Sequence, residues 1–173
     1  MSANRAALER LNRLRREEAV AELLKCCGSQ KWTASMVDAR PFQSEQHVFD
    51  SAEQIFKGLA QRDWLEAFRH HPKIGGQKAA VEVSADAQRW SEQEQARSAD
   101  AGAQVRAGLE RANAQYESRF GYFFIVCASS KSAEEMLAIL KSRMANQPEK
   151  ELEAAAGEQA KITQLRLKRM LDL

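Results

Sequence analysis

The chain has 173 residues, of which 44% are hydrophobic and 29% charged, and its formal net charge is +2. This length suits one domain, and this composition is typical of a soluble globular protein, which excludes disordered and fibrous classes. The nearly balanced charge has no basic stripe, and no apolar run reaches 18 residues, so we expect neither nucleic-acid binding nor a membrane span.

Turn-forming residues are scarce, because the chain has only eight glycines and three prolines. Together they make up about 6% of the residues, against about 12% in average proteins. Sandwiches and barrels need frequent turns, so they are disfavoured. The sequence therefore predicts an all-α fold: one globular, bundle-like domain over residues 1–173, with seven or eight helices and one short extended aromatic segment.

The first half of the chain carries apolar residues at helical spacing. The pattern predicts one helix over residues 3–27, a linker or short helix over 28–43 and a helix over 44–59. A shorter helix follows, and Pro72 must end it at His70 or His71, because proline cannot continue a helix.

The second half contains the strand-like run. Residues 77–90 are polar and poorly periodic, which predicts a mobile surface segment, and residues 91–119 predict one or two helices broken near Gly102. The aromatic run at 122–127 is then predicted to be a buried extended segment. Ser132 opens another helix, which Asn146 and Pro148 close, and a last helix extends to about Met170.

The cysteines are Cys26, Cys27 and Cys127. An odd number with one adjacent pair is a poor disulfide framework, and none has the spacing of a metal site. We therefore expect buried free thiols in a reducing cytoplasm, no metal and no secretory signal. The amphipathic terminal helices permit a homodimer without requiring one.

Three positions depart from their surroundings. His71, held by Pro72, is either a general acid or base or the cap of a helix C-terminus. Ser91 and Glu94 have capping-box spacing, and a helix N-terminus there would also suit an anion or an oxygen-rich ligand. Arg166 shares a helix face with Ile162 and Met170, so it is either buried against a carboxylate or extended to solvent at the rim.

The extended run also has two interpretations. Its aromatic side chains are explained by core packing, while its main-chain groups are available to bind a planar ligand that carries amides.

Six motifs occur in order along nearly the whole chain. They are Arg40-Pro41-Phe42, His71-Pro72-x-Ile74-Gly75, Ser91-x-x-Glu94-Gln95, Asn113-x-x-Tyr116-x-x-Arg119-Phe120-Gly121, Phe124-Ile125-Val126-Cys127 and Arg166-Leu167. Together they resemble the 2-oxo-4-hydroxy-4-carboxy-5-ureidoimidazoline (OHCU) decarboxylase family. The resemblance implies an all-helical, cofactor-free carboxy-lyase that makes (S)-allantoin in urate degradation.

The resemblance also implies the site residues. His71, Glu94 and Arg166 would be catalytic, with Glu92 as the alternative carboxylate to Glu94. The substrate-binding residues would be Pro72, Ser91, Glu92, Gln93, Glu94, Gln95, Tyr122, Phe123, Phe124, Ile125 and Val126. The competing hypothesis is a helical protein-interaction module without catalysis.

Overall fold

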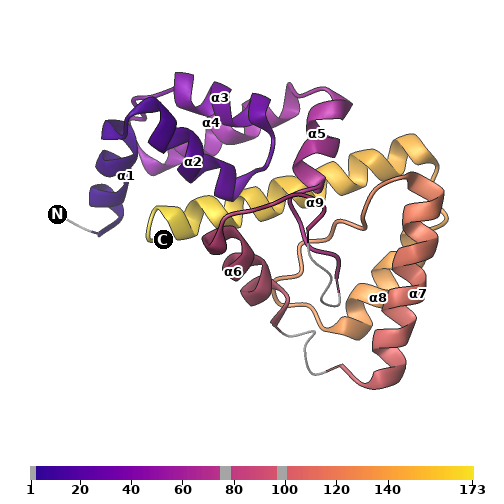
Figure 1. Ribbon diagram of the computed structural model, residues 1–173. Coiled ribbons are helices and arrows are strands. Elements are labelled where there is room, and N and C mark those ends of the chain that lie inside the picture. The colour runs from indigo at the N-terminus through magenta and orange to yellow at the C-terminus, as the bar shows by residue number, and fades with distance from the viewer. Residues whose placement is uncertain (1–2, 75–78, 97–100) are drawn as a thin grey trace. The chain divides into compact units, whose positions relative to one another are not determined.

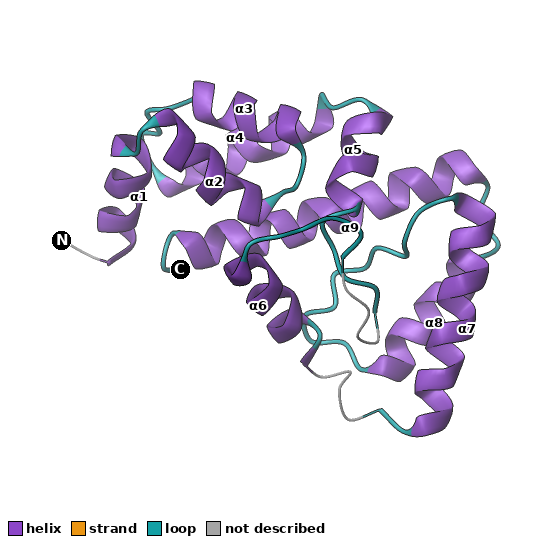
Figure 2. Cartoon of the chain, in the orientation of Figure 1, coloured by secondary structure: helices purple, strands orange, loops and turns teal. Residues whose placement is uncertain are grey.

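The computed structural model describes residues 3–74, 79–96 and 101–173, and these residues contain nine helices (Figure 1). Within these ranges the chain forms no strand, and loops join the helices (Figure 2). The predicted all-α fold is confirmed. The chain divides into two compact units, which are described separately: unit 1 is residues 1–67 and 160–173, and unit 2 is residues 68–159.

Unit 1 is built from short helices. Helix α2 packs on α3, and α4 packs on both α3 and α1. The end of α9 completes the unit. The helices that begin in it are α1 (Ala3–Arg13), α2 (Arg16–Cys26), α3 (Gln30–Asp38), α4 (Glu45–Lys57) and α5 (Gln61–Phe68).

The single helix predicted over residues 3–27 is wrong, because α1 and α2 are separate. At Arg15 the backbone has a ψ of 158°, which leaves the helical region. Glu18 stabilises the new start by accepting hydrogen bonds from the Arg15 N–H at 3.0 Å and from its guanidinium. Arginine is not among the preferred N-cap residues, and the leucines keep their helical spacing across Arg15. No residue type in the sequence therefore marks the start of a second helix here.

Serine caps explain where α3 and α4 begin. The Ser29 hydroxyl accepts the Trp32 N–H at 3.2 Å, and the Ser44 hydroxyl accepts the His47 N–H at 3.1 Å. The indole of the buried Trp32 donates to the Ala52 carbonyl at 3.1 Å, which joins α3 to α4. The predicted short helix over residues 28–43 is thereby confirmed.

Unit 2 contains α6 (Ala85–Glu94), α7 (Ala103–Phe120), α8 (Ala133–Arg143) and the first part of α9 (Pro148–Met170). Helix α7 packs on α8 (Figure 1). Gly121, at a φ of +80°, ends α7. Residues 123–128 follow without helix or strand and are buried from Phe124 onward. We call residues 123–128 the extended segment. The Ser132 capping box of α8 is confirmed, since Ser132 and Glu135 satisfy each other's N–H groups.

Two predictions about the region of helix α6 are wrong. The Ser84 hydroxyl caps it by accepting the Ala87 N–H at 3.2 Å, so residues 85–90 are helical rather than a mobile segment. Ser91 lies inside the helix and donates its hydroxyl to the Ala87 carbonyl at 3.0 Å. A capping box and a helix N-terminus at Ser91 are therefore wrong, and Glu94 is at the opposite end of α6. Gly75 and Gly76 lie outside the described residues.

The three cysteines are free and buried, as predicted. Burial raises the pKa of each thiol, that of Cys27 to about 11. In the described part of the chain, every helix is too short or too polar to cross a bilayer. The same residues include no group of three His, Cys, Asp or Glu side chains that could hold a metal ion.

Candidate active site

His71 follows the end of α5 and is 7% exposed. Its N–H donates to the Phe68 carbonyl at 3.1 Å, and its Nε2 lies 2.7 Å from Oε1 of Gln159, which is fully buried. An amide oxygen only accepts, so in this arrangement Nε2 carries a hydrogen. Gln159 thereby orients an imidazole that lies beside Pro72.

The loop after His71 is held against α7. The Ile74 carbonyl accepts a hydrogen bond from Asn113 at 3.1 Å. Lys73 pairs with Glu117 at 2.6 Å, and its ammonium lies 4.6 Å from the centre of the Phe123 ring. These contacts join the His71 loop to the aromatic segment, which is 50 residues away in the sequence.

Helix α6 presents two neighbouring faces. Ala87, Ser91 and Glu94 form the buried face, and Glu94 is 8% exposed. Glu92 is exposed and accepts a hydrogen bond from Gln88 at 3.1 Å, while Gln93 is exposed. Of the two candidate carboxylates, Glu94 is the one removed from bulk water.

A hollow of about 560 Å³ lies beside α6, a size typical of small-molecule sites. It brings together four of the predicted substrate-binding residues: Pro72, Ser91, Glu92 and Gln95. Residues 79–83 and Gln88 complete its described lining.

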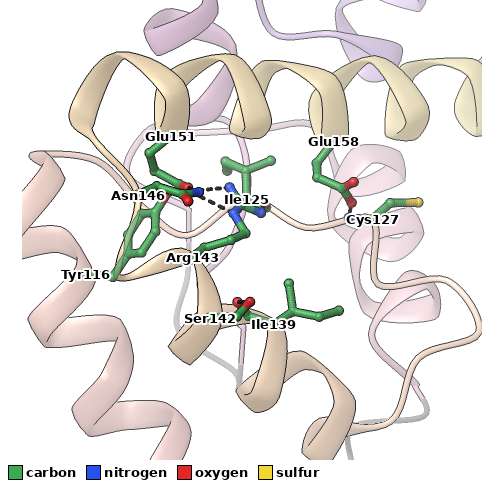
Figure 3. A network of polar contacts seen from close by, with 9 residues as sticks. All are labelled: Tyr116, Ile125, Cys127, Ile139, Ser142, Arg143, Asn146, Glu151 and Glu158. Atoms are coloured by element: carbon green, nitrogen blue, oxygen red, sulfur yellow. Dashed lines mark hydrogen bonds and ion pairs between the residues drawn. The ribbon is translucent and has the colours of Figure 1, made fainter.

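The extended segment is held through its main chain (Figure 3). The Ile125 carbonyl accepts a hydrogen bond from Arg143 Nη1 at 2.7 Å. The Cys127 N–H donates to Glu158 at 2.7 Å, and the Cys127 carbonyl accepts from Lys131 Nζ at the same distance. Side chains from α8, from α9 and from the turn before α8 therefore fix residues 125 and 127.

Next to Ile125 lies a cluster of polar side chains around Glu151, which is fully buried (Figure 3). Glu151 accepts hydrogen bonds from Arg143 Nε at 2.8 Å, from Asn146 at 2.7 Å and from the Tyr116 hydroxyl. Burial and this bond to Glu151 raise the pKa of Tyr116. We call Tyr116, Arg143, Asn146 and Glu151 the Glu151 cluster.

Two adjacent residues of α9 connect the parts of the site in unit 2. Glu158 binds the Cys127 N–H, and Gln159 binds His71. Burial raises the pKa of the Cys127 thiol most; Lys131 opposes this rise, while the negative charges of Glu158 and Glu94 add to it. Helix α9 thus connects His71 to the extended segment, and the charge of Glu94 acts on the Cys127 thiol of that segment.

Arg166 belongs to unit 1 and is 3% exposed. Its Nη1 donates to the Lys25 carbonyl at 3.1 Å, and Ile162 and Met170 on the same helix are also buried. The interpretation of Arg166 as an arginine at the solvent rim is therefore wrong.

The sequence interpretation missed Arg143, Glu151, Glu158 and Gln159. A signal for two of them was present in α9, where Glu151, Ala155, Gln159 and Thr163 follow one another at intervals of four. All four are buried, so polar residues interrupt an inward-facing stripe. Such interruptions mark buried polar contacts.

Comparisons with known proteins agree on one family. Residues 12–168 match the family model described as OHCU decarboxylase. The 2-oxo-4-hydroxy-4-carboxy-5-ureidoimidazoline decarboxylase of Amia calva is 32% identical over 139 residues, which cover 80% of this chain and 79% of that protein. The uric acid degradation bifunctional protein TTL of Arabidopsis thaliana is 38% identical over 148 residues, which cover 85% of this chain but only 45% of that protein.

A solved structure extends the agreement to three dimensions. The crystal structure of OHCU decarboxylase in the presence of (S)-allantoin matches with a TM-score of 0.77 and 35% identity, over 88% of this chain and 99% of that chain. A crystal structure of (S)-allantoin synthase, 16% identical with a TM-score of 0.67, shares the fold. The chain belongs to the OHCU decarboxylase family.

Proposed function

We propose that this chain decarboxylates OHCU to (S)-allantoin in urate degradation, as one domain over residues 1–173 and without a cofactor. The observation that carries the proposal is the pair of buried groups in unit 2, the His71 imidazole and the Glu94 carboxylate, in a chain of this family. An imidazole and a carboxylate are side chains that can move protons to and from a substrate with a hydroxyl group and ring nitrogen atoms. The proposed setting is the reducing cytoplasm, which suits three free thiols.

The chemistry of the substrate explains why no cofactor is needed. One ring carbon carries both the carboxylate and a hydroxyl, and it lies beside a ring C=N bond. When CO2 leaves, the electrons of the broken C–C bond move toward this imine, whose nitrogen takes a proton. The first product is an enol, which becomes allantoin when the hydroxyl loses its proton and the neighbouring ring carbon gains one.

In this proposal His71 and Glu94 move these protons. Glu94 accepts the hydrogen bond, and then the proton, of the hydroxyl. His71 delivers a proton to the imine side or to the ring carbon, and delivery to one face gives a single enantiomer. Gln159 holds the imidazole in position at 2.7 Å.

The other assigned residues bind the substrate. Arg166 holds a carboxylate or urea oxygen with its planar guanidinium. Pro72 and residues 91–95 line the ring, and the main chain of residues 122–126 binds the ureido and ring amides.

The test replaces the proton-transfer groups in the full chain, with OHCU generated freshly from urate. We expect His71→Ala and Glu94→Ala to keep the helical circular dichroism signal and to lose about 10²–10⁴-fold in the rate of CO2 release. The product should also lose its optical activity. Glu92→Ala, which removes the exposed carboxylate two residues earlier, should lose far less, and His47→Ala controls for the removal of a histidine.

Full activity in His71→Ala would overturn the mechanism. Equal losses in Glu92→Ala and Glu94→Ala would overturn the choice of Glu94. The alternative, a non-catalytic interaction module, requires an apolar docking stripe on a terminal helix. Among the described residues, the exposed large apolar side chains are Val81 and Leu173, and neither belongs to a helix.

A further inference from the structure

The main chain of the extended segment has one occupied edge and one open edge. At residues 125 and 127, three main-chain groups are bound by Arg143, Glu158 and Lys131. In contrast, the main chains of Phe124 and Val126 make no hydrogen bond to the part of the chain that the structure describes. The two residues are only 3% and 4% exposed, so water is largely excluded from these polar groups.

The main-chain groups of alternate residues are bound and unbound, and this alternation follows from backbone geometry. In an extended chain, the N–H and C=O of one residue point to one edge, and those of the next residue point to the opposite edge. The bound groups belong to the alternate residues Ile125 and Cys127, which is the pattern of an extended backbone. Such a backbone directs the groups of Phe124 and Val126 to the other edge. A buried main-chain group without a partner costs stability, and a ligand that pairs with this edge would remove that cost.

We propose that Glu158 and Arg143 are positioning residues for the substrate. They hold the occupied edge, and the open edge at Phe124 and Val126 thereby presents alternating N–H and C=O groups to a planar ligand. This inference rests on the proposed function, and it identifies which main-chain groups bind the substrate and which side chains place them.

The chemical class of the ligand fits this edge. A ureido group and a cyclic amide each present N–H beside C=O in one plane, which is the pattern that a peptide edge pairs with. The Glu151 cluster supports the arrangement, since Glu151 binds Arg143 Nε while Arg143 Nη1 binds Ile125. The guanidinium also lies 4.8 Å from the centre of the Phe124 ring, which fixes the segment from a second side.

The experiment compares three changes on α9 in the full chain. Glu158→Ala removes the acceptor of the Cys127 N–H, and Glu158→Gln keeps an acceptor oxygen but removes the charge. Glu153→Ala is the matched control, because Glu153 is an exposed glutamate on the same helix. For each variant, KM and kcat with OHCU and the affinity for (S)-allantoin by calorimetry are measured, together with Tm.

We expect Glu158→Ala to raise KM and to weaken (S)-allantoin binding at least tenfold, with a smaller effect on kcat. Glu158→Gln should stay within about threefold of the wild type in KM and in the affinity for (S)-allantoin, and Glu153→Ala should match the wild type. Arg143→Lys provides a second test: a single ammonium nitrogen replaces the separate Nε and Nη1 donors, so the bond to the Ile125 carbonyl should weaken and KM should rise about tenfold. If Glu158→Ala does not fold, the inference is tested by the raised KM expected for Arg143→Lys against the nearly unchanged KM expected for Glu158→Gln.

Wild-type affinity in both Glu158→Ala and Arg143→Lys would overturn the inference. It would also be overturned if Glu158→Gln lost as much affinity as Glu158→Ala, because the charge and not the hydrogen bond would then matter. A wild-type chain that neither converts OHCU nor binds (S)-allantoin would refute the proposed function itself, which separates the two failures.

Discussion

The buried ion pair between Arg143 and Glu151 gives the strongest prediction for stability. We expect Glu151→Gln to lower the free energy of unfolding by about 3–5 kcal/mol, the cost of leaving one member of a buried pair without its partner. Glu151 is fully buried, and the Arg143 side chain is 11% exposed. Water therefore cannot solvate the Arg143 guanidinium in place of the lost carboxylate. The substitution keeps the side-chain volume, which separates this loss from the cost of a cavity.

The contacts of Glu151 explain the size of the effect. Its Oε1 accepts from Arg143 and from the Tyr116 hydroxyl, and its Oε2 accepts from Asn146. Glutamine has one acceptor oxygen and an amide that can only donate, so at least one of these donors must face another donor. Each lost hydrogen bond adds about 1–3 kcal/mol when its partner stays buried.

Urea unfolding, followed by the helical circular dichroism signal, measures this loss. The control is Lys57→Met, which breaks the exposed Lys57–Glu53 pair of α4 and should change the free energy of unfolding by less than about 1 kcal/mol. The double variant Arg143→Met with Glu151→Leu should be more stable than Glu151→Gln, because it leaves no unpaired charge. A loss below about 1 kcal/mol for Glu151→Gln would refute the argument.

Two further predictions concern the backbone and the thiols. Gly121→Ala should cost about 1–2 kcal/mol in urea unfolding, because Gly121 has a φ of +80° and a Cβ there meets no atom within 4 Å, whereas Gly157→Ala, inside α9 and equally uncrowded, should stabilise the chain; a neutral Gly121→Ala would contradict this. At pH 8 the three cysteines should react with a disulfide reagent only after unfolding, because burial raises the pKa of each thiol and leaves little thiolate in the folded chain. Immediate reaction of one thiol in the folded chain would contradict the burial of that cysteine.

Local signals in the sequence predicted most of the helices. They failed where a capping pattern occurs inside a helix that has already begun. Ser-x-x-Glu occurs at Ser91 and at Ser132, and only Ser132 caps a helix. At Ser91 the pattern fails because Ser84 has already opened the helix seven residues earlier, in a stretch whose polar residues hid its periodicity. The same spacing therefore has two structural outcomes, and the context upstream decides between them.

The candidate site shows a different limit. His71 and Glu94 could be predicted as candidates because one is a histidine beside a proline and the other a glutamate within a motif. Glu151 and Gln159 did not, since a glutamate and a glutamine on a charged helix are ordinary until their burial is known. Only the fold shows that these side chains are directed inward.

The Glu151 cluster also shows how neighbouring helices fix a main-chain segment that is itself neither helix nor strand. A segment without helix or strand has no ladder partners, so its position must be fixed by side chains from neighbouring helices. Arg143 suits this task because separate nitrogens of its planar guanidinium bind Glu151 and the Ile125 carbonyl, whereas a lysine has a single ammonium nitrogen for both. The buried charge that this requires is costly by itself, and Glu151 offsets that cost. In this chain the buried ion pair therefore stabilises one conformation of the segment, and the proposed binding edge at Phe124 and Val126 depends on that conformation.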